Sequence, residues 1–164
     1  MATVTTHDVG LEALDELKDV DALCLFVAED ERPLRGIAGY VDWRLCGALS
    51  RVLQSGFFVG ARGDSLLLPS DGRFPVPRIF VIGLGRRKGL DASSLGEALT
   101  NAGQVLARAK VEGVALEIPG STALDEATRA SSLTDRFLPA FKGGRKVAVL
   151  ADKELARRLP GRKG

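Results

Sequence analysis

The feature that most constrains the fold is a regular alternation of apolar runs and amphipathic stretches in the second half of the chain. The apolar runs are short enough for buried strands, and the stretches between them repeat apolar residues at helical spacing. In chain order they predict a strand, helix, strand, helix and strand at residues 79–84, 94–109, 113–118, 122–141 and 146–151. This order predicts consecutive right-handed βαβ units, and therefore an α/β fold with a mostly parallel sheet.

The first half of the chain adds elements of the same kinds. The sequence DALCLFVA at residues 21–28 is typical of a buried parallel strand. Helical spacing of apolar residues predicts one continuous helix over residues 41–54, ended by Gly56. Two short runs at residues 57–60 and 65–68, separated by ARGD, predict a hairpin. Since no repeat, linker or low-complexity segment divides the chain, we expect one domain over residues 1–164.

Short local signals predict where these elements begin and end. The spacing of Ser94 and Glu97 fits a capping box at the start of the second-half helix. The next helix is expected to be capped by Thr122 and ended by the glycines at 143–144. A last short helix in DKELARRLP precedes the tail GRKG, which we expect to fray.

Charge and composition exclude several classes of protein. The formal net charge is +2, so no strong overall field attracts nucleic acid or anionic lipid. MATVTTHDVG does not resemble a secretion signal, and no apolar run approaches the roughly 18 residues of a membrane span. We therefore expect a cytoplasmic globular protein. The two cysteines, Cys24 and Cys46, are expected to be small core residues.

The sequence offers little material for a metal or nucleophilic centre. His7 is the single histidine, and it lies in a polar N-terminal segment. Without a second histidine or a cysteine pair at ligand spacing, we predict no metal site and no cofactor. A serine triad is discounted because no base is in reach. The acidic cluster at residues 29–31 is interpreted as a solvated loop.

The sequence RIFVIGLGRRKG suggests a phosphate-binding loop. Gly83 and Gly85 stand between a parallel strand and a helix, where backbone amides can hold an anion, and residues 86–88 would add positive charge. A complete dinucleotide fingerprint would need glycine where Lys88 stands. Glycines are also common at tight strand exits, so a structural turn and an anion site both stay open.

A second candidate loop is EIPGS at residues 117–121, which contains Pro119, Gly120 and Ser121. It follows the next predicted strand and leads into a helix. In open parallel sheets ligands bind beyond the carboxyl ends of the strands, so both loops could face one crevice. The proline and glycine could equally be turn residues.

A candidate interface lies in YVDWRLCGALSRVL, where Trp43 and Arg44 stand in the predicted amphipathic helix. Tryptophan anchors many protein interfaces because it combines a large apolar area with an N–H donor. A single tryptophan can also be partly buried structure. Few aromatics and scattered basic residues disfavour a nucleic-acid platform.

Three longer segments resemble a known family. DALCLFVAEDERPLRGIAGYVDWRLCGALSRVLQSGFFVG, LLLPSDGRFPVPRIFVIGLGRRKGLD and GVALEIPG resemble the N-terminal domain of the leucyl aminopeptidases of the M17 peptidase family, from about residue 21 to 152. DWRLCGALS and VIGLG are the most specific parts. The resemblance implies a three-layer, macro-domain-like α/β fold, with a mixed, mostly parallel sheet and helices on both faces.

The resemblance also implies what the chain does not do. In the full enzymes a second domain binds two metal ions and performs the hydrolysis, and its NTDAEGR-type signature does not occur in these 164 residues. No catalytic residue can therefore be carried over, and we expect no enzyme activity. Macro domains bind ADP-ribose, and by resemblance the loop from Gly36 to Gly39 and the loop at residues 119–121 occupy similar places. The asparagines of the hydrolysing members are replaced by FVAEDERP, which argues against hydrolysis.

These observations favour a stand-alone, non-catalytic module that acts through contacts with a protein partner or a second copy of the chain. In the full-length relatives this domain helps to assemble a hexamer. The first alternative is a module that binds ADP-ribose, a nucleotide or another phosphate ligand. A further alternative is DNA binding, since some full-length relatives also bind DNA. We expect no membrane partner.

Overall fold

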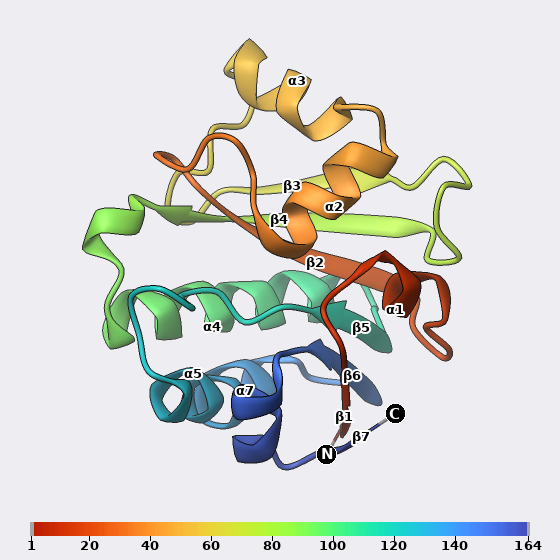
Figure 1. Ribbon diagram of the computed structural model, residues 1–164, viewed down its shortest axis with the longest axis vertical. Coiled ribbons are helices and arrows are strands. Elements are labelled where there is room, and N and C mark those ends of the chain that lie inside the picture. The colour runs from red at the N-terminus through yellow and green to blue at the C-terminus, as the bar shows by residue number, and fades with distance from the viewer. Residues whose placement is uncertain (1, 164) are drawn as a thin grey trace.

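A seven-stranded sheet forms the middle layer of the structure, a computed structural model that describes residues 2–163 (Figure 1). The strand order is β3-β4-β2-β5-β6-β1-β7. Within the described residues every strand pair is parallel except β3–β4. The strands are β1 (Thr3–His7), β2 (Ala22–Ala28), β3 (Ser65–Pro69), β4 (Arg78–Gly85), β5 (Gly113–Leu116), β6 (Lys146–Leu150) and β7 (Arg162–Lys163).

Helices cover both faces of this sheet, which confirms the three-layer α/β expectation. One face carries α1 (Leu11–Asp15), α2 (Gly36–Arg44) and α3 (Ala48–Ser55). The other carries α4 (Ala92–Arg108), α5 (Glu126–Ser132), the π turn η2 (Leu133–Phe137), α6 (Leu138–Ala140) and α7 (Lys153–Arg158). A short 3₁₀ turn, η1 (Arg87–Gly89), follows β4. None of the helices in residues 2–163 combines the length and apolar character needed to cross a membrane.

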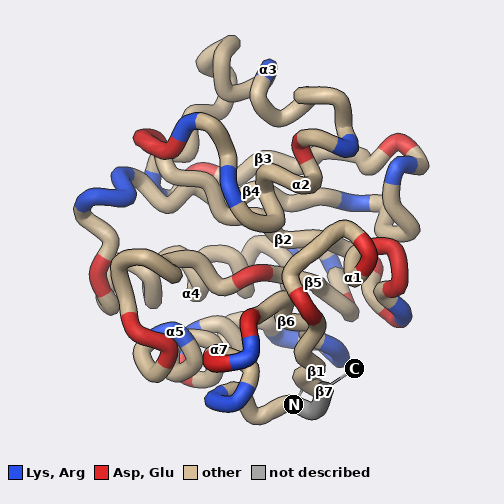
Figure 2. The backbone as a smooth tube through the Cα atoms, in the orientation of Figure 1, with Lys and Arg blue, Asp and Glu red and all other residues tan. Residues whose placement is uncertain are grey.

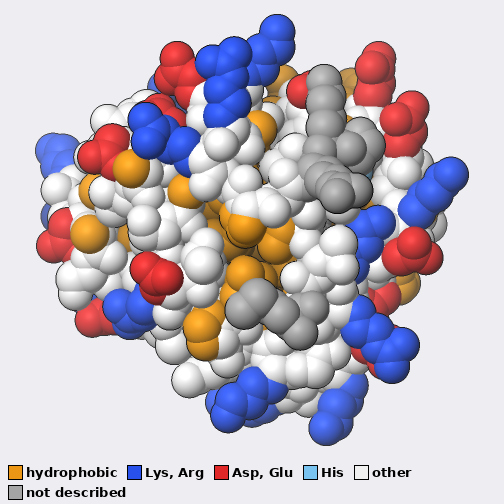
Figure 3. Space-filling model, turned by 90° about the horizontal axis from the view of Figure 1, so that it is seen from below, with side chains coloured by type: hydrophobic (Ala, Val, Ile, Leu, Met, Phe, Trp, Pro, Cys, Tyr) orange, Lys and Arg blue, Asp and Glu red, His pale blue; other side chains and the backbone are white. Residues whose placement is uncertain are grey.

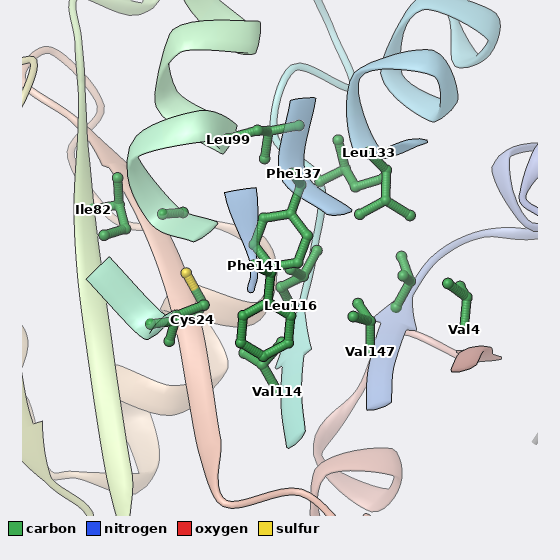
Figure 4. Close-up of a cluster of buried hydrophobic side chains, with 14 of the residues drawn as sticks. Val4, Cys24, Ile82, Leu99, Val114, Leu116, Leu133, Phe137, Phe141 and Val147 are labelled. Atoms are coloured by element: carbon green, nitrogen blue, oxygen red, sulfur yellow. The ribbon is translucent and has the colours of Figure 1, made fainter. Parts of the chain in front are cut away.

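Strand side chains alternate between two hydrophobic cores because successive residues of a strand point to opposite faces. In β2, Cys24 packs toward α4, and Leu23 and Leu25 pack toward α2 and α3. Figure 4 shows the first core, where the rings of Phe137 and Phe141 lie 5.4 Å apart among strand side chains. Both faces of the central strands are buried, which explains their continuous apolar runs.

The predicted hairpin over residues 57–68 is wrong. Residues 57–60 lie outside any strand, and β3 pairs antiparallel with β4, so that Leu66 lies opposite Val81. The long, buried β4 offers β3 a complete hydrogen-bonding edge. The segment 57–60 instead passes beside the end of β4, where Gly60 accepts the N–H of Gly85 at 2.9 Å.

The single helix predicted over residues 41–54 is also wrong. The structure has two helices there, separated at Cys46 and Gly47, whose φ angles are 55° and 79°. Left-handed backbone cannot continue an α-helix, so the chain turns between α2 and α3. As a result Cys46 is exposed rather than a core residue, whereas Cys24 is buried as expected.

Two predicted helix starts are displaced. Helix α4 begins earlier, because Asp91 accepts the N–H of Ser94 and the hydroxyl of Ser94 accepts the N–H of Asp91. The capping box is therefore Asp91–Ser94 rather than Ser94–Glu97. Helix α5 is capped by Asp125. Thr122 lies before that helix, and its hydroxyl pairs with the side chain of Arg87.

Both ends of the described chain join the sheet at one edge. The segment interpreted as a polar N-terminus contains β1, which pairs with β6. The tail predicted to fray contributes β7, which pairs with β1 at Thr5 and Thr6. Gly164, the last residue of that tail, lies outside the described residues. Short polar strands near the edge of a sheet carry a weak sequence signal because only part of each strand needs to be apolar.

Candidate functional site

A cavity of about 180 Å³ lies beyond the carboxyl ends of β2, β4 and β5. This is the edge of a parallel sheet where ligands usually bind. Four structural parts form its wall: the ends of the central strands, the start of α2, the turn after β4 and the loop after β5. The lining residues include Ala28, Glu31, Arg35, Gly36, Ile37, Leu84, Arg87, Glu117, Pro119, Gly120, Ser121 and Thr122.

The carboxylate of Glu117 occupies one side of this cavity. Glu117 directly follows β5, and its Oε2 accepts the backbone N–H of Ile37 at 2.7 Å. Ile37 lies in the first turn of α2, where backbone N–H groups have no partner within the helix. A distant strand thus supplies the acceptor that a local capping side chain would normally provide.

Gly36 is required for this contact. Its φ is +59°, and a Cβ built there would lie 2.7 and 2.9 Å from the two carboxylate oxygens of Glu117. Any side chain at position 36 would therefore displace the carboxylate. The sequence resemblance assigned Gly36 to a ligand loop, and here the glycine makes room for a carboxylate of the same chain.

Burial raises the pKa of the Glu117 carboxyl above its ordinary value. The N–H of Ile37 and the positive charge of Arg129 oppose this shift, and the negative charges of Glu31 and Asp152 add to it. Arg129 is only 3% exposed, and its guanidinium donates to the carbonyl oxygens of Ile118 at 2.5 Å and Pro119 at 3.3 Å. Arg129 therefore fixes the loop that carries Glu117.

The rim of the cavity is held by Arg87. Its guanidinium lies 3.3 Å from the carboxylate of Glu31 and donates to the hydroxyl of Thr122. Its backbone N–H donates to Asp30 at 2.6 Å. These contacts join the loops that follow β2, β4 and β5. One member of the basic cluster at residues 86–88 is thus a rim residue, and the acidic loop at residues 29–31 is its partner.

The structure brings only part of the predicted ligand set together. Gly36, Pro119, Gly120 and Ser121 line the cavity. Gly39 lies one turn into α2, where an added Cβ would be 2.8 Å from the carbonyl oxygen of Leu34, so it allows close packing rather than facing the cavity.

Gly83 and Gly85 have a different role from the predicted anion loop. The N–H of Gly83 donates to the backbone carbonyl oxygen of Asp64 and the N–H of Gly85 donates to that of Gly60, each at 2.9 Å. Since both amides are used within the protein, the structure assigns the two glycines to the close approach of the segment at residues 60–64. Among the residues at the end of β4, Leu84 lines the cavity.

The predicted interface residues lie apart from the cavity and differ from each other. Trp43 is 72% exposed at the end of α2, beside a groove that also contains Arg73. Arg44 is engaged within the protein: it contacts Asp15 at 2.5 and 3.1 Å and lies 5.0 Å from the ring centre of Phe74. Only the tryptophan is free to meet a partner.

Three residues are missed or undervalued by sequence reasoning. Glu117 belongs to the candidate loop EIPGS but is not among its predicted ligand residues, although an acidic residue within the apolar stretch GVALEIPG is a usable signal. Glu31 is assigned to a solvated loop. Phe57 is 82% exposed, whereas the sequence pattern places it in a strand.

The cavity contains charged and hydrogen-bonding groups. Among residues 2–163, no three His, Cys, Asp or Glu side chains are grouped so that they could hold a metal ion. The polar groups of the wall are Glu31, Arg35, Arg87, Glu117 and the hydroxyls of residues 121–122. This set can bind and orient a small molecule.

Curated relatives that resemble the chain are aminopeptidases. A probable cytosol aminopeptidase of Thermosynechococcus vestitus is 25% identical over 142 residues, which cover 87% of this chain and 28% of the relative. Another, from Syntrophotalea carbinolica, is 32% identical over 129 residues, which cover 72% of this chain and 26% of the relative. The chain therefore spans little more than a quarter of these relatives.

Solved structures share the fold at lower identity. A tomato leucine aminopeptidase mutant has a TM-score of 0.70 and 17% identity, and the match covers 96% of this chain and 34% of that one. A Trypanosoma brucei macrodomain in complex with ADP-ribose has a TM-score of 0.69 and 11% identity, with 94% and 67% covered. These similarities confirm the macro-domain-like fold.

The sequence match to a protein family is more specific than these similarities in fold. Residues 23–138 match the family described as "Cytosol aminopeptidase family, N-terminal domain". The matched segment runs from β2 to the start of α6, so it contains the cavity, Glu117 and Trp43. Since this is well over half of the 164 residues, the chain belongs to the cytosol aminopeptidase family, through its N-terminal domain.

Proposed function

We propose that this N-terminal-type module is non-catalytic and acts through protein contacts, with a second copy of the chain as its partner. The observation that carries the proposal is the exposure of Trp43, 72%, at the end of α2. A large, exposed aromatic side chain is a frequent anchor of interfaces. The assembly role that the family resemblance implies for this domain and the exposed ring of Phe57 support the same function.

The proposal is tested by measuring molar mass over a wide range of concentrations by light scattering after size exclusion. We expect the unmodified chain to form a dimer or larger assembly, and Trp43→Ala to shift it to the monomer. Leu67→Ala is the control, because Leu67 is 53% exposed on the edge strand β3, away from α2. A chain that stays monomeric throughout, or that assembles equally well without the tryptophan, would refute the proposal.

A second candidate function is binding of ADP-ribose or a nucleotide in the cavity. It is supported by the position of Gly36 and residues 119–121 on the cavity wall, and by the ADP-ribose complex of the similar T. brucei macrodomain. Calorimetry with ADP-ribose and common nucleotides tests it. No heat at millimolar ligand would eliminate this candidate.

The DNA-binding alternative has less support. Blue and red stretches are scattered over the backbone in Figure 2, and the face in Figure 3 shows residues of both signs. A DNA-binding surface normally gathers basic residues in one patch. Association with DNA that weakens strongly with added salt would support this alternative.

We also propose that the module has no peptidase activity of its own. An aminopeptidase assay of the 164-residue chain with added zinc or manganese is expected to be blank, and turnover by the pure protein would contradict it. We expect the module to work in the cytoplasm, in agreement with the names of its relatives.

A further inference from the structure

The carboxyl group of Glu117 already occupies part of the cavity. It accepts the N–H of Ile37 in the first turn of α2, a nine-residue helix whose N-terminal end carries partial positive charge. In other proteins a ligand's phosphate often binds at such a helix end. Here a side chain from the end of β5 occupies the same position.

We propose that Glu117 is a resident anion that keeps phosphate groups out of the cavity, so that removing its carboxylate opens a phosphate-binding site. The inference concerns the specificity of the cavity and goes beyond the protein-contact function, because Trp43 lies outside the cavity wall. It argues against the second candidate function, binding of ADP-ribose or a nucleotide by the unmodified chain.

The contact between Gly36 and Glu117 supports this role. Both carboxylate oxygens lie against Gly36, at distances where a Cβ would collide with them. A phosphate oxygen could reach the N–H of Ile37 only by displacing Oε2, which is 2.7 Å away. The carboxylate therefore blocks a phosphate by occupying its space, by using its hydrogen-bond donor and by like charge.

The remaining wall would suit a phosphate once the carboxylate is gone. Arg35 lines the cavity and Ser121 brings a hydroxyl group to it, whereas Arg87 and Thr122 pair with each other on the rim. Arginine is well suited to phosphate because its planar guanidinium can donate two parallel hydrogen bonds. Glu117→Ala would leave the N–H of Ile37 without its partner while these donors stay in place.

The charges around Glu117 make its exclusion of phosphate depend on pH. Arg129 from α5 favours the ionised carboxyl, whereas Glu31 after β2 and Asp152 before α7 disfavour it, as burial does. The pKa of Glu117 is raised, so acid neutralises this carboxyl at a higher pH than an exposed glutamate.

The experiment uses inorganic pyrophosphate as the probe and the backbone resonance of Ile37 as the reporter, with calorimetry for affinity. At neutral pH we expect no binding by the unmodified chain and at least about a tenfold gain in affinity for Glu117→Ala. Glu117→Gln should gain less, because its amide oxygen can still accept the N–H of Ile37. Glu112→Ala is the control, since it removes an exposed carboxylate that pairs with Arg145 at 3.5 Å, at the opposite end of β5.

Two outcomes would overturn the inference. One is a Glu117→Ala variant that folds, as judged by circular dichroism, yet binds pyrophosphate no better than the unmodified chain. The other is equally tight binding by both proteins with the same shift at Ile37. Heat without a shift at Ile37 counts as the first outcome, because the anion would then be bound elsewhere.

A measurement on the unmodified chain covers the case in which the variant does not fold. The amide shift of Ile37 should follow the ionisation of Glu117, with a midpoint above the ordinary glutamate pKa. Pyrophosphate affinity should rise as pH falls through that midpoint. An Ile37 resonance that does not respond in this range would show that Glu117 does not hold the helix end, and would overturn the proposal.

Discussion

At Gly83 two segments of backbone come so close that no side chain fits between them. A Cβ at this position would collide with the carbonyl oxygen of Ala61 and would lie 2.8 Å from the carbonyl carbon of Gly60. The glycine next but one, Gly85, has φ +74°, a conformation that L side chains rarely adopt. The glycines of VIGLG thus allow one loop to lie against the end of the central strand.

Gly83→Ala should therefore lower the free energy of unfolding by about 3 kcal/mol, because backbone atoms must move to admit the methyl group. Gly89→Ala is the matched control. No atom lies within 4 Å of the position of its Cβ, so its effect should stay within about 0.5 kcal/mol. Urea unfolding of both variants measures the difference. Equal midpoints for the two variants would contradict the close approach.

Glu117 makes the stability of the fold depend on pH in a specific direction. Its folded-state pKa is raised, so the folded chain holds this proton more tightly than the unfolded chain. Its contribution to stability therefore falls as pH rises from the ordinary glutamate value of about 4.3 through the folded-state pKa. Above the folded-state pKa the contribution no longer changes.

Glu117→Gln removes this dependence. The stability of the variant relative to the unmodified chain should increase as pH rises from the ordinary glutamate value of about 4.3 through the raised pKa of Glu117, as measured by urea unfolding at a series of pH values. Other carboxyls are present in both proteins, so their titration cancels in the difference. A difference that stays constant with pH would show that Glu117 is not held in a desolvated site.

At the scale of elements, α2 is the helix whose position matters most. Its first turn is capped by Glu117 from β5, and its last residue, Arg44, contacts Asp15 of α1. After Arg44, left-handed backbone at Cys46 and Gly47 turns the chain into α3. These contacts fix the helix between the cavity at one end and the exposed Trp43 at the other.

Arg44→Ala should lower the free energy of unfolding by about 1 kcal/mol, the sum expected for one exposed ion pair and one cation–π contact. Alanine can reach neither the carboxylate of Asp15 nor the ring of Phe74, whose centre lies 5.0 Å from the guanidinium of Arg44. Thermal and urea unfolding measure the change. Arg44→Lys keeps the positive charge but lacks the planar guanidinium group, so it should recover only part of this stability. If alanine and lysine were equivalent to arginine, the contact would not hold α2.

At the scale of the whole molecule, the order of the sheet determines which parts open first. β2 and β4 pair along their full lengths and are covered on both faces, whereas β3 and β7 are the edges of the sheet. Local opening is cheapest where few buried contacts must break.

Amide hydrogen exchange should follow this order. We expect the slowest exchange in β2 and β4, and much faster exchange in β7 and at the outward-facing amides of β3. Measurement by NMR resolves single amides, and the inward-facing amides of β3 serve as an internal control because they pair with β4. Edge amides protected as strongly as those of β2 would indicate that another chain covers the edge, as assembly through β3 would require.

How much the sequence predicts depends on whether a signal is local. The strands at residues 79–84 and 146–151 are predicted closely because both of their faces are buried, and the helix over 94–109 because it has one broad apolar face. The hairpin and the single helix over 41–54 are wrong, since their outcome depends on pairing with β4 and on two left-handed residues. The capping residues of α4 and α5 differ from prediction because several nearby polar residues could serve.

The sequence by itself determined the class of the fold, the parallel order implied by its βαβ alternation, and the loops that gather at one end of the sheet. Patterns of apolar residues fix these features because burial is their common cause. Only the tertiary structure decided what the loops do there. The amides of Gly83 and Gly85 donate to backbone carbonyls of the segment at residues 60–64, and Glu117 accepts the N–H of Ile37, 80 residues away in the chain. Contacts over such separations leave no periodic signal, because they depend on where the elements meet in space.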